Sequence, residues 1–559
     1  MSGLLLQAFD RLAQAPGGVA RLRELILSLA VQGRLVAQSE RDEPVAVVLQ
    51  EIQLAKGGAL PRRRSRATDT GDAPIAPFAL PDTWDWVRLG EVTDISGGVT
   101  LGRKGTIEQP MTLPYLRVAN VQRWNVLCDD LKTITIGRAE LARYQLRAGD
   151  LLITEGGDWD KVGRTAIWRD EVAVCLHQNH VFKARGLTPR WNPEWAQLYL
   201  NSPIARDYFA SCSKQTTNLA SINMTQLKAC AFPLPPVAEQ ARIVARVDEL
   251  MRLCDALEAK GRLEAEQHTR LLDTLLGTLT DSATPEELAA NWQRVAEHFD
   301  QLLDRPEAVD ALEQTVLQLA VRGLLVPQDT TERTPPADSN ALRRSGSDPI
   351  DEAELPYDVP SNWQWVRLGS VADLINGDRG TNYPNKSEYV ATGLPFINTG
   401  HIEPDGTLSH ESMHYLTRKK FESLRGGKTL PGDLVYCLRG ATLGKTAIVE
   451  YPEGAIASSL VIIRLDQAID RKYMYYYLTG PMGKSLVRRF DNGSAQPNLA
   501  ANSVKRYVVP LPPAAEQRRI VARVEELRRL CAELRKRLSA SQATQSRLAE
   551  TLVESVASA

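Results

Sequence analysis

A glycine-rich segment in the last third of the chain gives the most direct hint of catalysis. Residues 440–446 read GATLGKT. A loop that cradles nucleotide phosphates has four residues between its two glycines, and here only three separate Gly440 from Gly444. The spacing therefore predicts a strand–turn element, in which Lys445 could approach a phosphate.

Two other polar groups could in principle do chemistry. His177 and His180 bracket Gln178 and Asn179, but no cysteine or carboxylate lies at the spacing of a metal site. Asp158 and Asp160 precede Lys161, a pattern seen in nucleases, yet the related stretch at 439–442 carries no acids. No Ser/His/Asp arrangement, dinucleotide-binding glycine motif or methyl-donor motif occurs, so we expect no catalytic centre and no metal site.

The remaining chemistry suits the edges of DNA bases. Arginine pairs with guanine, and asparagine or glutamine with adenine, through two hydrogen bonds each. Polar and basic residues of these types gather in two glycine-rich regions. The candidates of the first region are Arg117, Asn120, Gln122, Arg123, Lys161, Arg164, Gln178, Asn179, Lys214, Gln215 and Asn218. Those of the second are Arg379, Asn382, Lys386, Asn398, His401, Arg439, Lys445, Ser494, Gln496 and Asn498.

Both regions are followed by the same motif, which reveals an internal repeat. Residues 233–257 read PLPPVAEQARIVARVDELMRLCDAL, and residues 510–534 read PLPPAAEQRRIVARVEELRRLCAEL. The two segments agree at 19 of 25 positions. Proline favours the first turn of a helix and is excluded from its interior, so each PLPP segment predicts an elbow before a long helix.

Each predicted helix carries an apolar seam with alternating spacings of four and three, the pattern of a coiled coil. Two near-identical seams in one chain are expected to pack on each other. The seam residues are Ile243, Val247, Leu250, Cys254 and Leu257 in the first copy and Ile520, Val524, Leu527, Cys531 and Leu534 in the second.

The repeat extends over the whole chain. Residues 9–36 match 299–326 at 13 of 28 positions and predict a short helical hairpin in each copy. WDWVRLG at 84–90 matches WQWVRLG at 363–369, and AGDL and GRTAI in the first copy match PGDL and GKTAI in the second. Between these anchors the copies differ almost everywhere, so the frame is shared while the loops are individual.

These observations predict an α+β chain of two α/β domains in tandem, spaced by a pair of long antiparallel helices around a pseudo-two-fold axis. The expected boundaries are an N-terminal helical hairpin (1–56), a linker (57–80), a first domain (81–236), a central long helix with hairpin (237–330), a second linker (331–358), a second domain (359–512) and a C-terminal long helix (513–559). The basic run at 61–66, which reads PRRRSR, could be a solvated linker or could contact DNA phosphates.

Composition excludes several classes of protein. The apolar runs are too short to span a membrane, and the N-terminus lacks the regions of a signal peptide. Seven single cysteines without a CxxC pair argue against a disulfide framework and fit a reducing cytoplasm. The formal net charge is −1, so DNA binding would depend on local basic patches.

The layout resembles the specificity subunits of Type I restriction-modification systems. The resemblance rests on the PLPPxxEQ helices at 233 and 510, the WxWVRLG segments at 84 and 363, the GDL and G[RK]TAI anchors, and TNLASIN at 217–223. It covers nearly the whole chain. The second copy departs from this pattern, since it reads GSAQPNL at 493–499 where the first has the TNLASIN region.

The resemblance implies that the two variable domains are target recognition domains, each reading one half of a bipartite DNA site, while the paired helices set the gap. It also implies two methylation subunits that bind S-adenosylmethionine, and restriction subunits that use ATP and Mg²⁺. No cofactor is expected on this chain itself. Two other functions stay open: a coiled-coil scaffold without DNA reading, and a nuclease or methyltransferase that acts on its own.

Overall fold

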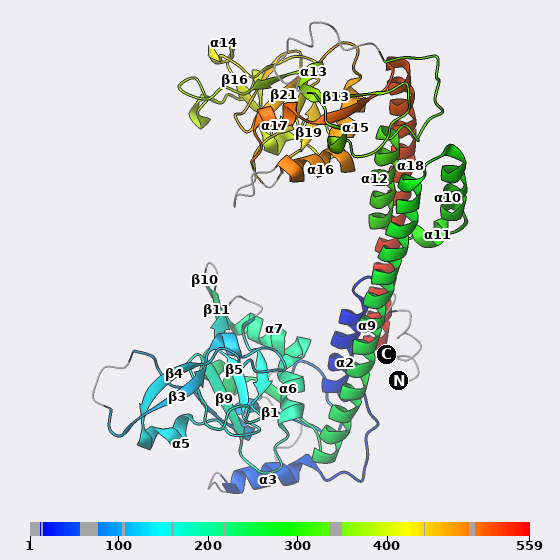
Figure 1. The fold of residues 1–559 in the computed structure, drawn as a ribbon. Coiled ribbons are helices and arrows are strands. Elements are labelled where there is room, and N and C mark those ends of the chain that lie inside the picture. Colours follow the sequence, from blue (N-terminus) through cyan, green and yellow to red (C-terminus); the bar gives the residue numbers. More distant parts are fainter. Residues whose placement is uncertain are drawn as a thin grey trace. The chain divides into compact units, whose positions relative to one another are not determined.

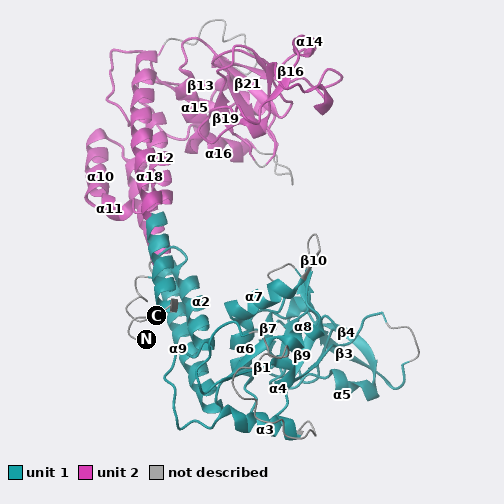
Figure 2. Cartoon of the chain, turned by 180° about the vertical axis from the view of Figure 1, so that it is seen from behind, with its two compact units in different colours: residues 1–263, 542–559 teal, residues 264–541 magenta. Residues whose placement is uncertain are grey.

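The protein was analysed as a computed structural model, which describes residues 12, 15–55, 76–102, 107–157, 161–216, 219–334, 349–440, 442–490 and 498–558. The chain forms two compact units (Figure 2). Unit 1 comprises residues 1–263 and 542–559, and unit 2 comprises residues 264–541. Each unit therefore contains one of the two predicted variable domains and parts of both long helices.

Unit 1 contains four small sheets (Figure 1). A four-stranded antiparallel sheet has the order β2 (Thr93–Ser96), β9 (Val181–Gly186), β5 (Leu151–Thr154), β7 (Thr165–Ile167). The others are β4 (Lys132–Gly137), β3 (Pro110–Leu116), β8 (Leu176–His177); β10 (Lys214–Thr216), β11 (Leu219–Ser221), β6 (Gly156–Gly157); and the pair β1 (Asp85–Arg88), β12 (Ala231–Leu234). Strand β1 runs antiparallel to β12, so the first and last strands of the domain are neighbours.

Unit 2 repeats this arrangement with small changes. Its central antiparallel sheet has the order β14 (Ala372–Asn376), β21 (Leu460–Leu465), β18 (Leu434–Cys437), β19 (Thr446–Ile448). A second sheet has the order β16 (His414–Leu416), β15 (Leu394–Ile397), β20 (Gly454–Ile456), β17 (Lys428–Thr429), and β13 (Gln364–Arg367) pairs with β22 (Val508–Leu511). The strand order of the two central sheets is equivalent, which confirms the predicted tandem of mixed helix-and-sheet domains.

Helices surround these sheets in both units. The helices of the first copy are α2 (Gly18–Val31), α3 (Val45–Ala55), α4 (Leu89–Val92), α5 (Leu141–Tyr144), α6 (Pro193–Asn201), α7 (Pro203–Cys212), α8 (Met224–Ala229) and the long α9 (Val237–Asp281), with short 3-10 turns η1 (Val118–Asn120) and η2 (Arg138–Glu140). Those of the second are α10 (Pro285–Glu297), α11 (Phe299–Leu302), α12 (Pro306–Val321), α13 (Leu368–Val371), α14 (Arg418–Ser423), α15 (Arg471–Thr479), α16 (Pro481–Phe490), α17 (Ala501–Lys505) and the long α18 (Ala514–Ser558), with η5 (Glu352–Glu354), η6 (Lys386–Glu388) and η7 (Thr399–His401).

The repeated sequence blocks meet at one junction in each unit. In unit 1 the side-chain amide of Gln38 donates hydrogen bonds to the carbonyl of Gly33 (3.1 Å) and to Glu239 of α9 (2.7 Å), whose side chain is fully buried. In unit 2, Gln328 donates in the same way to Gly323 (2.8 Å) and to Glu516 (2.6 Å). Burial raises the pKa of both glutamates, partly opposed by the polar side chains around them.

A glycine is required at each junction because the neighbouring domain approaches closely. Gly33 has a φ of 70°, a left-handed conformation that side chains disfavour, and a Cβ atom there would lie 2.5 Å from Pro81 and 3.0 Å from Trp84. Gly323 has a φ of 76°, and a Cβ atom there would lie 2.5 Å from Pro360 and 3.2 Å from Trp363. The LAVxG, WxWVRLG and PLPPxxEQ blocks are therefore repeated because they contact one another.

The long helices pair differently from the seam-on-seam contact that we expected. Seam residues Ile243, Val247, Leu250 and Cys254 belong to a core shared with α2 and with Ala549 and Val556 near the end of α18. Ile520 and Val524 belong to a separate core with α12 and the second domain. Cys531, with Leu534 and Leu538 beside it, shares a third cluster with Leu272, Leu276 and Leu279 near the end of α9. The start of each long helix thus packs near the end of the other, so the antiparallel pair is confirmed while its contacts are head to tail.

The predicted linkers lie mostly outside the described residues, and so does the basic run at 61–66. Equivalent ion pairs hold the segment before the first linker and the start of the second. Asp42 accepts two hydrogen bonds from Arg242 (2.6 and 3.0 Å), and Glu332 accepts two from Arg519 (2.9 and 3.0 Å). Within the described residues, no helix combines the length and the apolar character needed to cross a bilayer.

Candidate nucleic-acid interface

A buried ion pair supports the candidate loops in each domain. The Asp150 carboxylate is 1% exposed and accepts two hydrogen bonds from Arg185 of β9 (2.6 and 2.7 Å) and one from the backbone N–H of Arg147 (2.8 Å). In the second domain, Asp433 is bound in the same way by Arg464 of β21. These aspartates are the acids of the two GDL anchors, so that motif is repeated because it fixes a turn to the central sheet.

Two of the predicted base-reading residues cap a short turn instead. The side chain of Asn120 is buried, accepts a hydrogen bond from the backbone N–H of Arg117 (2.9 Å), and donates to the carbonyl of Leu127 (3.0 Å). His401 occupies the equivalent place, where its Nδ1 accepts from the backbone N–H of Asn398 (3.1 Å). Burial lowers the pKa of His401, which favours this neutral, accepting form. Asn120 and His401 therefore cap these turns, and their contact with bases stays a prediction.

Other candidates also have partners within the protein. The Arg117 guanidinium pairs with Asp130 (2.8 Å) and holds the pKa of that carboxyl below its usual range. Arg123 donates to the side chain of Asn201 (3.4 Å). The Asn398 amide contacts His414 (3.3 Å). These contacts fix the geometry of the loops. Base reading by the other candidate side chains stays a prediction.

The basic residues of the G[RK]TAI anchors reach across to the same neighbouring turn in both copies. Arg164 donates to the side chain of Gln122 (2.7 Å), while Lys445 donates to the carbonyl of Ile402 (2.7 Å). Gly440 and residues 442–445 lie in the turn between β18 and β19, with Gly440 and Gly444 in left-handed conformations (φ 88° and 80°), while Ala441 falls outside the described residues. Because the Lys445 amine binds a backbone carbonyl, the turn is built as a connection between strands.

The histidine pair at 177 and 180 is split between two environments. His177 lies in the core on β8, and its Nδ1 contacts the carbonyl of Val181 (2.7 Å). Burial lowers its pKa to about 4, so the ring is neutral. His180 is exposed and pairs with Glu155. Among the described residues, no three His, Cys, Asp or Glu side chains come close enough together to hold a metal ion.

A second pair of loops meets beside these turns. In the first domain, Gly156 of β6 pairs with Ser221 of β11, and in the second Arg439 forms an isolated bridge with Asn498. Lys214 and Gln215 lie on β10, but their side chains, like all of Asn218, Ser494 and Gln496, fall outside the described residues. Equivalent strands therefore carry different side chains at the same place, as expected of two readers with different targets.

Other candidates lie partly or fully at the surface. Arg379, Lys386 and Arg439 are exposed, and Gln178, Asn179, Asn382 and Lys161 are half-buried. They come from loops next to the central sheets, apart from Lys386 on η6. The structure thus separates the predicted set into side chains that build the loops and side chains that the loops present.

Sequence reasoning missed Trp124, which follows Arg123 in the first domain. This tryptophan has a left-handed backbone (φ 77°) and is 42% exposed, although a bulky residue rarely adopts that conformation. Its backbone is held by hydrogen bonds with Thr165 and with the side chain of Gln197. Only the structure reveals this residue, because nothing in its sequence context indicates a positive φ.

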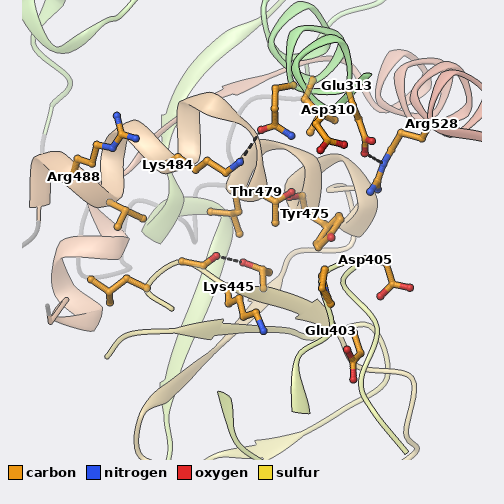
Figure 3. Close-up of a pocket in the computed structure, with 18 of the residues that line it drawn as sticks. Asp310, Glu313, Glu403, Asp405, Lys445, Tyr475, Thr479, Lys484, Arg488 and Arg528 are labelled. Atoms are coloured by element: carbon orange, nitrogen blue, oxygen red, sulfur yellow. Dashed lines mark hydrogen bonds and ion pairs between the residues drawn. The ribbon is translucent and has the colours of Figure 1, made fainter. Parts of the chain in front are cut away.

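A hollow of about 810 Å³ in unit 2 was also missed (Figure 3). It lies between the second domain and helices α12, α15, α16 and α18, and its walls carry charges of both signs. Lys484 and Arg488 of α16 are exposed, and Lys445 lines the same hollow. The basic side chains of α16 therefore extend the candidate surface of the second domain beyond the loops that the sequence indicated.

Comparison with known proteins agrees with this architecture. The sequence model of the Type I restriction modification DNA specificity domain matches residues 81–267 and 360–541. The chain is 28% identical to the Type I restriction enzyme EcoAI specificity subunit of Escherichia coli and 27% identical to the EcoEI specificity subunit of the same organism, with 96% of this chain and 93% of each relative covered.

A solved structure shares the fold. A solved chain from work on complex assembly and conformational transition of the type I R-M system aligns with a TM-score of 0.52 at 20% identity, covering 86% of this chain and 99% of that one. Because both variable domains match the family and the repeated frame is built from its anchors, the chain belongs to the family of Type I restriction-modification specificity subunits.

Proposed function

We propose that this chain is the DNA-recognition subunit of a Type I restriction-modification complex and has no catalytic centre of its own. Each variable domain reads one half of a bipartite site. The observation that carries this proposal is a shared frame with different loops: Asp150 and Asp433 are held identically, while Gly156 and Arg439 occupy one position with unlike chemistry. Two copies of one enzyme would need the same reactive groups in both domains.

Affinity and specificity would come from different side chains. Arginines and lysines such as Arg439, Lys484 and Arg488 would contact phosphates and make binding salt-dependent, because each contact releases counterions. Amides such as Gln178 and Asn179 would contact base edges and supply sequence preference. A net charge of −1 over the whole chain makes such local clusters necessary.

The proposed partners are two methylation subunits and the restriction subunits of a cytoplasmic complex. S-adenosylmethionine, ATP and Mg²⁺ would bind to those partners and not to this chain. Equivalent leucines on the two long helices support two equal docking places: Leu253 is 43% exposed and Leu530 is 57% exposed, at the same position of the repeat. A single exposed leucine is ordinary on a protein surface, so the support lies in its repetition at the equivalent position of the second helix.

The decisive experiment maps methylated adenines in cells that carry the complete complex. We expect a split sequence with two defined halves. Exchanging residues 84–232 for the matching domain of a relative should change one half, and exchanging 363–509 should change the other. A chain that methylates or cuts DNA without partners would contradict the proposal, and so would a complex that protects no split sequence.

The spacer gives a second, independent test. Removing seven residues from the exposed middle of each long helix, within 258–270 and 535–547, shortens each helix by about 10 Å and nearly preserves its facing. That length equals about three base pairs. We expect a shorter gap between unchanged half-sites, and altered half-sites would contradict the proposed role of the helices as a spacer.

A further inference from the structure

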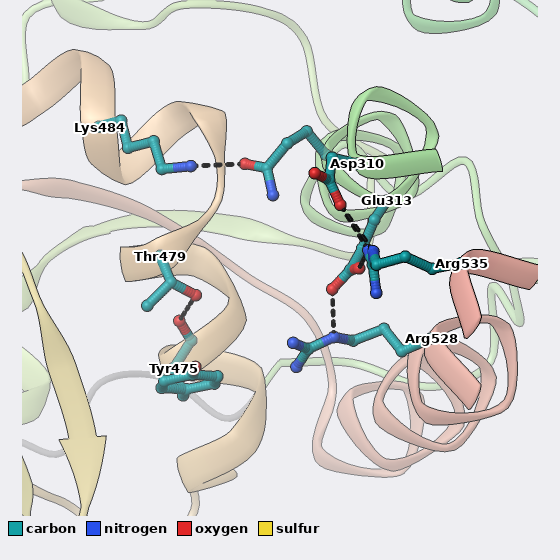
Figure 4. Close-up of polar contacts among 8 residues, drawn as sticks. Asp310, Glu313, Tyr475, Thr479, Lys484, Arg528 and Arg535 are labelled. Atoms are coloured by element: carbon teal, nitrogen blue, oxygen red, sulfur yellow. Dashed lines mark hydrogen bonds and ion pairs between the residues drawn. The ribbon is translucent and has the colours of Figure 1, made fainter. Parts of the chain in front are cut away.

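Each short helix is joined to its own long helix by ion pairs. In unit 1, Arg23 of α2 contacts Asp255 (2.5 Å) and Glu258 (2.8 Å) of α9. In unit 2 the contact runs from α18 to α12 (Figure 4): Arg535 contacts Asp310 (2.6 Å) and Glu313 (2.9 Å). Arg528 of α18 adds a further bond to Glu313 (2.6 Å). Both units therefore have an ionic clamp at the same place.

The signs of the two clamps are reversed. Under the alignment of the repeat, Arg23 of α2 corresponds to Glu313 of α12, and Glu258 of α9 corresponds to Arg535 of α18. The short helix is thus the basic partner in unit 1 and the acidic partner in unit 2. Two neighbouring positions fit this reversal. The acid Asp255 on the long helix of unit 1 corresponds to Ala532 in unit 2, and the acid Asp310 on the short helix of unit 2 corresponds to Ala20 in unit 1.

The apolar contacts beneath the clamps barely distinguish the copies. The long helices present the same residue types at nearly every seam position, and the short helices present similar ones. On the long helices these are Ile243, Val247, Leu250 and Cys254 against Ile520, Val524, Leu527 and Cys531; on the short helices they are Leu22, Ile26 and Leu29 against Leu312, Val316 and Leu319. In an exchanged pairing, α12 would pack on the first half of α9, and α2 on the first half of α18. Burial of apolar surface is non-directional, so it would stabilise this exchanged pairing almost as well as the native one.

The exchanged pairing is also closer along the chain. Helix α12 follows α9 after only the short helices α10 and α11. Glu258 precedes Glu313 by 55 positions, whereas Arg535 follows Glu313 by 222. Contacts between neighbours in sequence form faster than distant ones, because less loop entropy is lost first. During folding, α12 would meet the first half of α9 before α18 becomes available.

We propose that the reversed clamps are a pairing code that keeps each short helix on its own long helix. If α12 folded onto the first half of α9, Glu313 would face Asp255 and Glu258. If α2 folded onto the first half of α18, Arg23 would face Arg535. Both exchanged pairings oppose like charges where the native pairings attract, within one chain or between two copies of it.

The test uses the full chain and its two equivalent seam cysteines. An Ala311→Cys substitution places a thiol on α12 beside the cluster that contains Cys531. A short bis-maleimide added during refolding from urea links this thiol to Cys531 in the native pairing and to Cys254 in the exchanged one. Peptide mass mapping then gives the ratio of the two products.

Two sets of substitutions separate the code from general destabilisation. The first gives copy 2 the charges of copy 1: D310A, E313R, R528M, A532D and R535E. The second gives copy 1 the charges of copy 2: A20D, R23E, M251R, D255A and E258R. A chain with the first set alone keeps an attractive native clamp but no longer repels the exchanged pairing. A chain with both sets repels the exchanged pairing again.

We expect the first set alone to raise the ratio of the Cys254 product to the Cys531 product about tenfold, the effect of replacing repulsion by two or three exposed ion pairs. Both sets together should return the ratio to that of the native charges. An unchanged ratio in the first variant would overturn the proposal. A ratio that stays high with both sets would also overturn it, because it would show that the substitutions act through lost stability.

Discussion

The pair formed by Asp150 and Arg185 allows one domain to be perturbed while its twin serves as the control. In an Arg185→Met variant the Asp150 carboxylate, 1% exposed, would keep the backbone N–H of Arg147 as its one hydrogen-bond partner among the described residues, with Lys183 acting on it electrostatically. An uncompensated buried charge is costly because it has lost water without gaining a counter-charge. The equivalent change in the second domain is Arg464→Met, which isolates Asp433.

The expected loss of stability is about 3 kcal/mol, the lower end of the range for breaking a buried ion pair, because 29% of the Arg185 side chain is exposed and water screens it. Removing both charges, as in Asp150→Asn with Arg185→Met, should recover much of this loss. Since each 1.36 kcal/mol corresponds to a factor of ten, the open form of the sheet should become roughly 100-fold more populated.

Hydrogen exchange measured by mass spectrometry reports this opening locally. Backbone amides of β5 and β9 should exchange about 100-fold faster in Arg185→Met, whereas those of β18 and β21 should not change. In the assembled complex, the same variant should weaken recognition of one half-site only. Equal acceleration in both domains, or none in β5 and β9, would refute the conclusion that this ion pair fixes its own domain.

The remaining predictions concern acid stability, the junction and assembly. Because the folded chain holds His177 neutral down to a pKa of about 4 while the unfolded chain binds a proton near pH 6.5, the free energy of unfolding should fall by about 2 kcal/mol between pH 7.5 and pH 5, and His177→Phe should remove that loss in urea unfolding at these two pH values. Gly33→Ala should lower the stability of unit 1 by about 2 kcal/mol or more, since its Cβ would lie 2.5 Å from Pro81; Gly323→Ala should do the same in unit 2, and an unchanged midpoint in thermal unfolding would contradict both. Leu253→Asp and Leu530→Asp should leave the circular dichroism spectrum unchanged but each weaken binding of a methylation subunit, with the double variant binding none in size-exclusion chromatography.

The repeat made most of the architecture predictable. Two copies of one pattern identify the tandem domains, the elbows and the long helices, because the anchor residues contact one another in the fold. Gln38 and Glu239 illustrate this: each belongs to a region bounded by repeated sequence, and they meet at the junction. The head-to-tail pairing of the helices was not predictable, since identical seams fit several partners and only contacts such as those of Ala549 decide among them.

The candidate surface was predictable only by residue type. Asn120 and Gln178 are both amides in variable segments, yet Asn120 caps a turn in the interior while Gln178 is partly exposed. Sequence pattern does not distinguish an amide that binds its own backbone from one that awaits a ligand. The left-handed Trp124 was missed for a related reason: its conformation depends on Thr165 and Gln197, which lie far away in the sequence.

The pairing of β1 with β12 has a consequence for how such genes can change. Asp85 lies opposite Leu234, so the variable domain of the first copy begins and ends on adjacent strands, as Gln364 opposite Leu511 shows for the second. Both strands adjoin nearly invariant blocks of the repeat. Genetic recombination with crossovers in those blocks would therefore replace a whole domain. Both ends of the new domain would join the frame at the same pair of strands, and the positions of the surrounding helices would not change. New DNA specificities can then arise in one exchange, without a series of unstable intermediates.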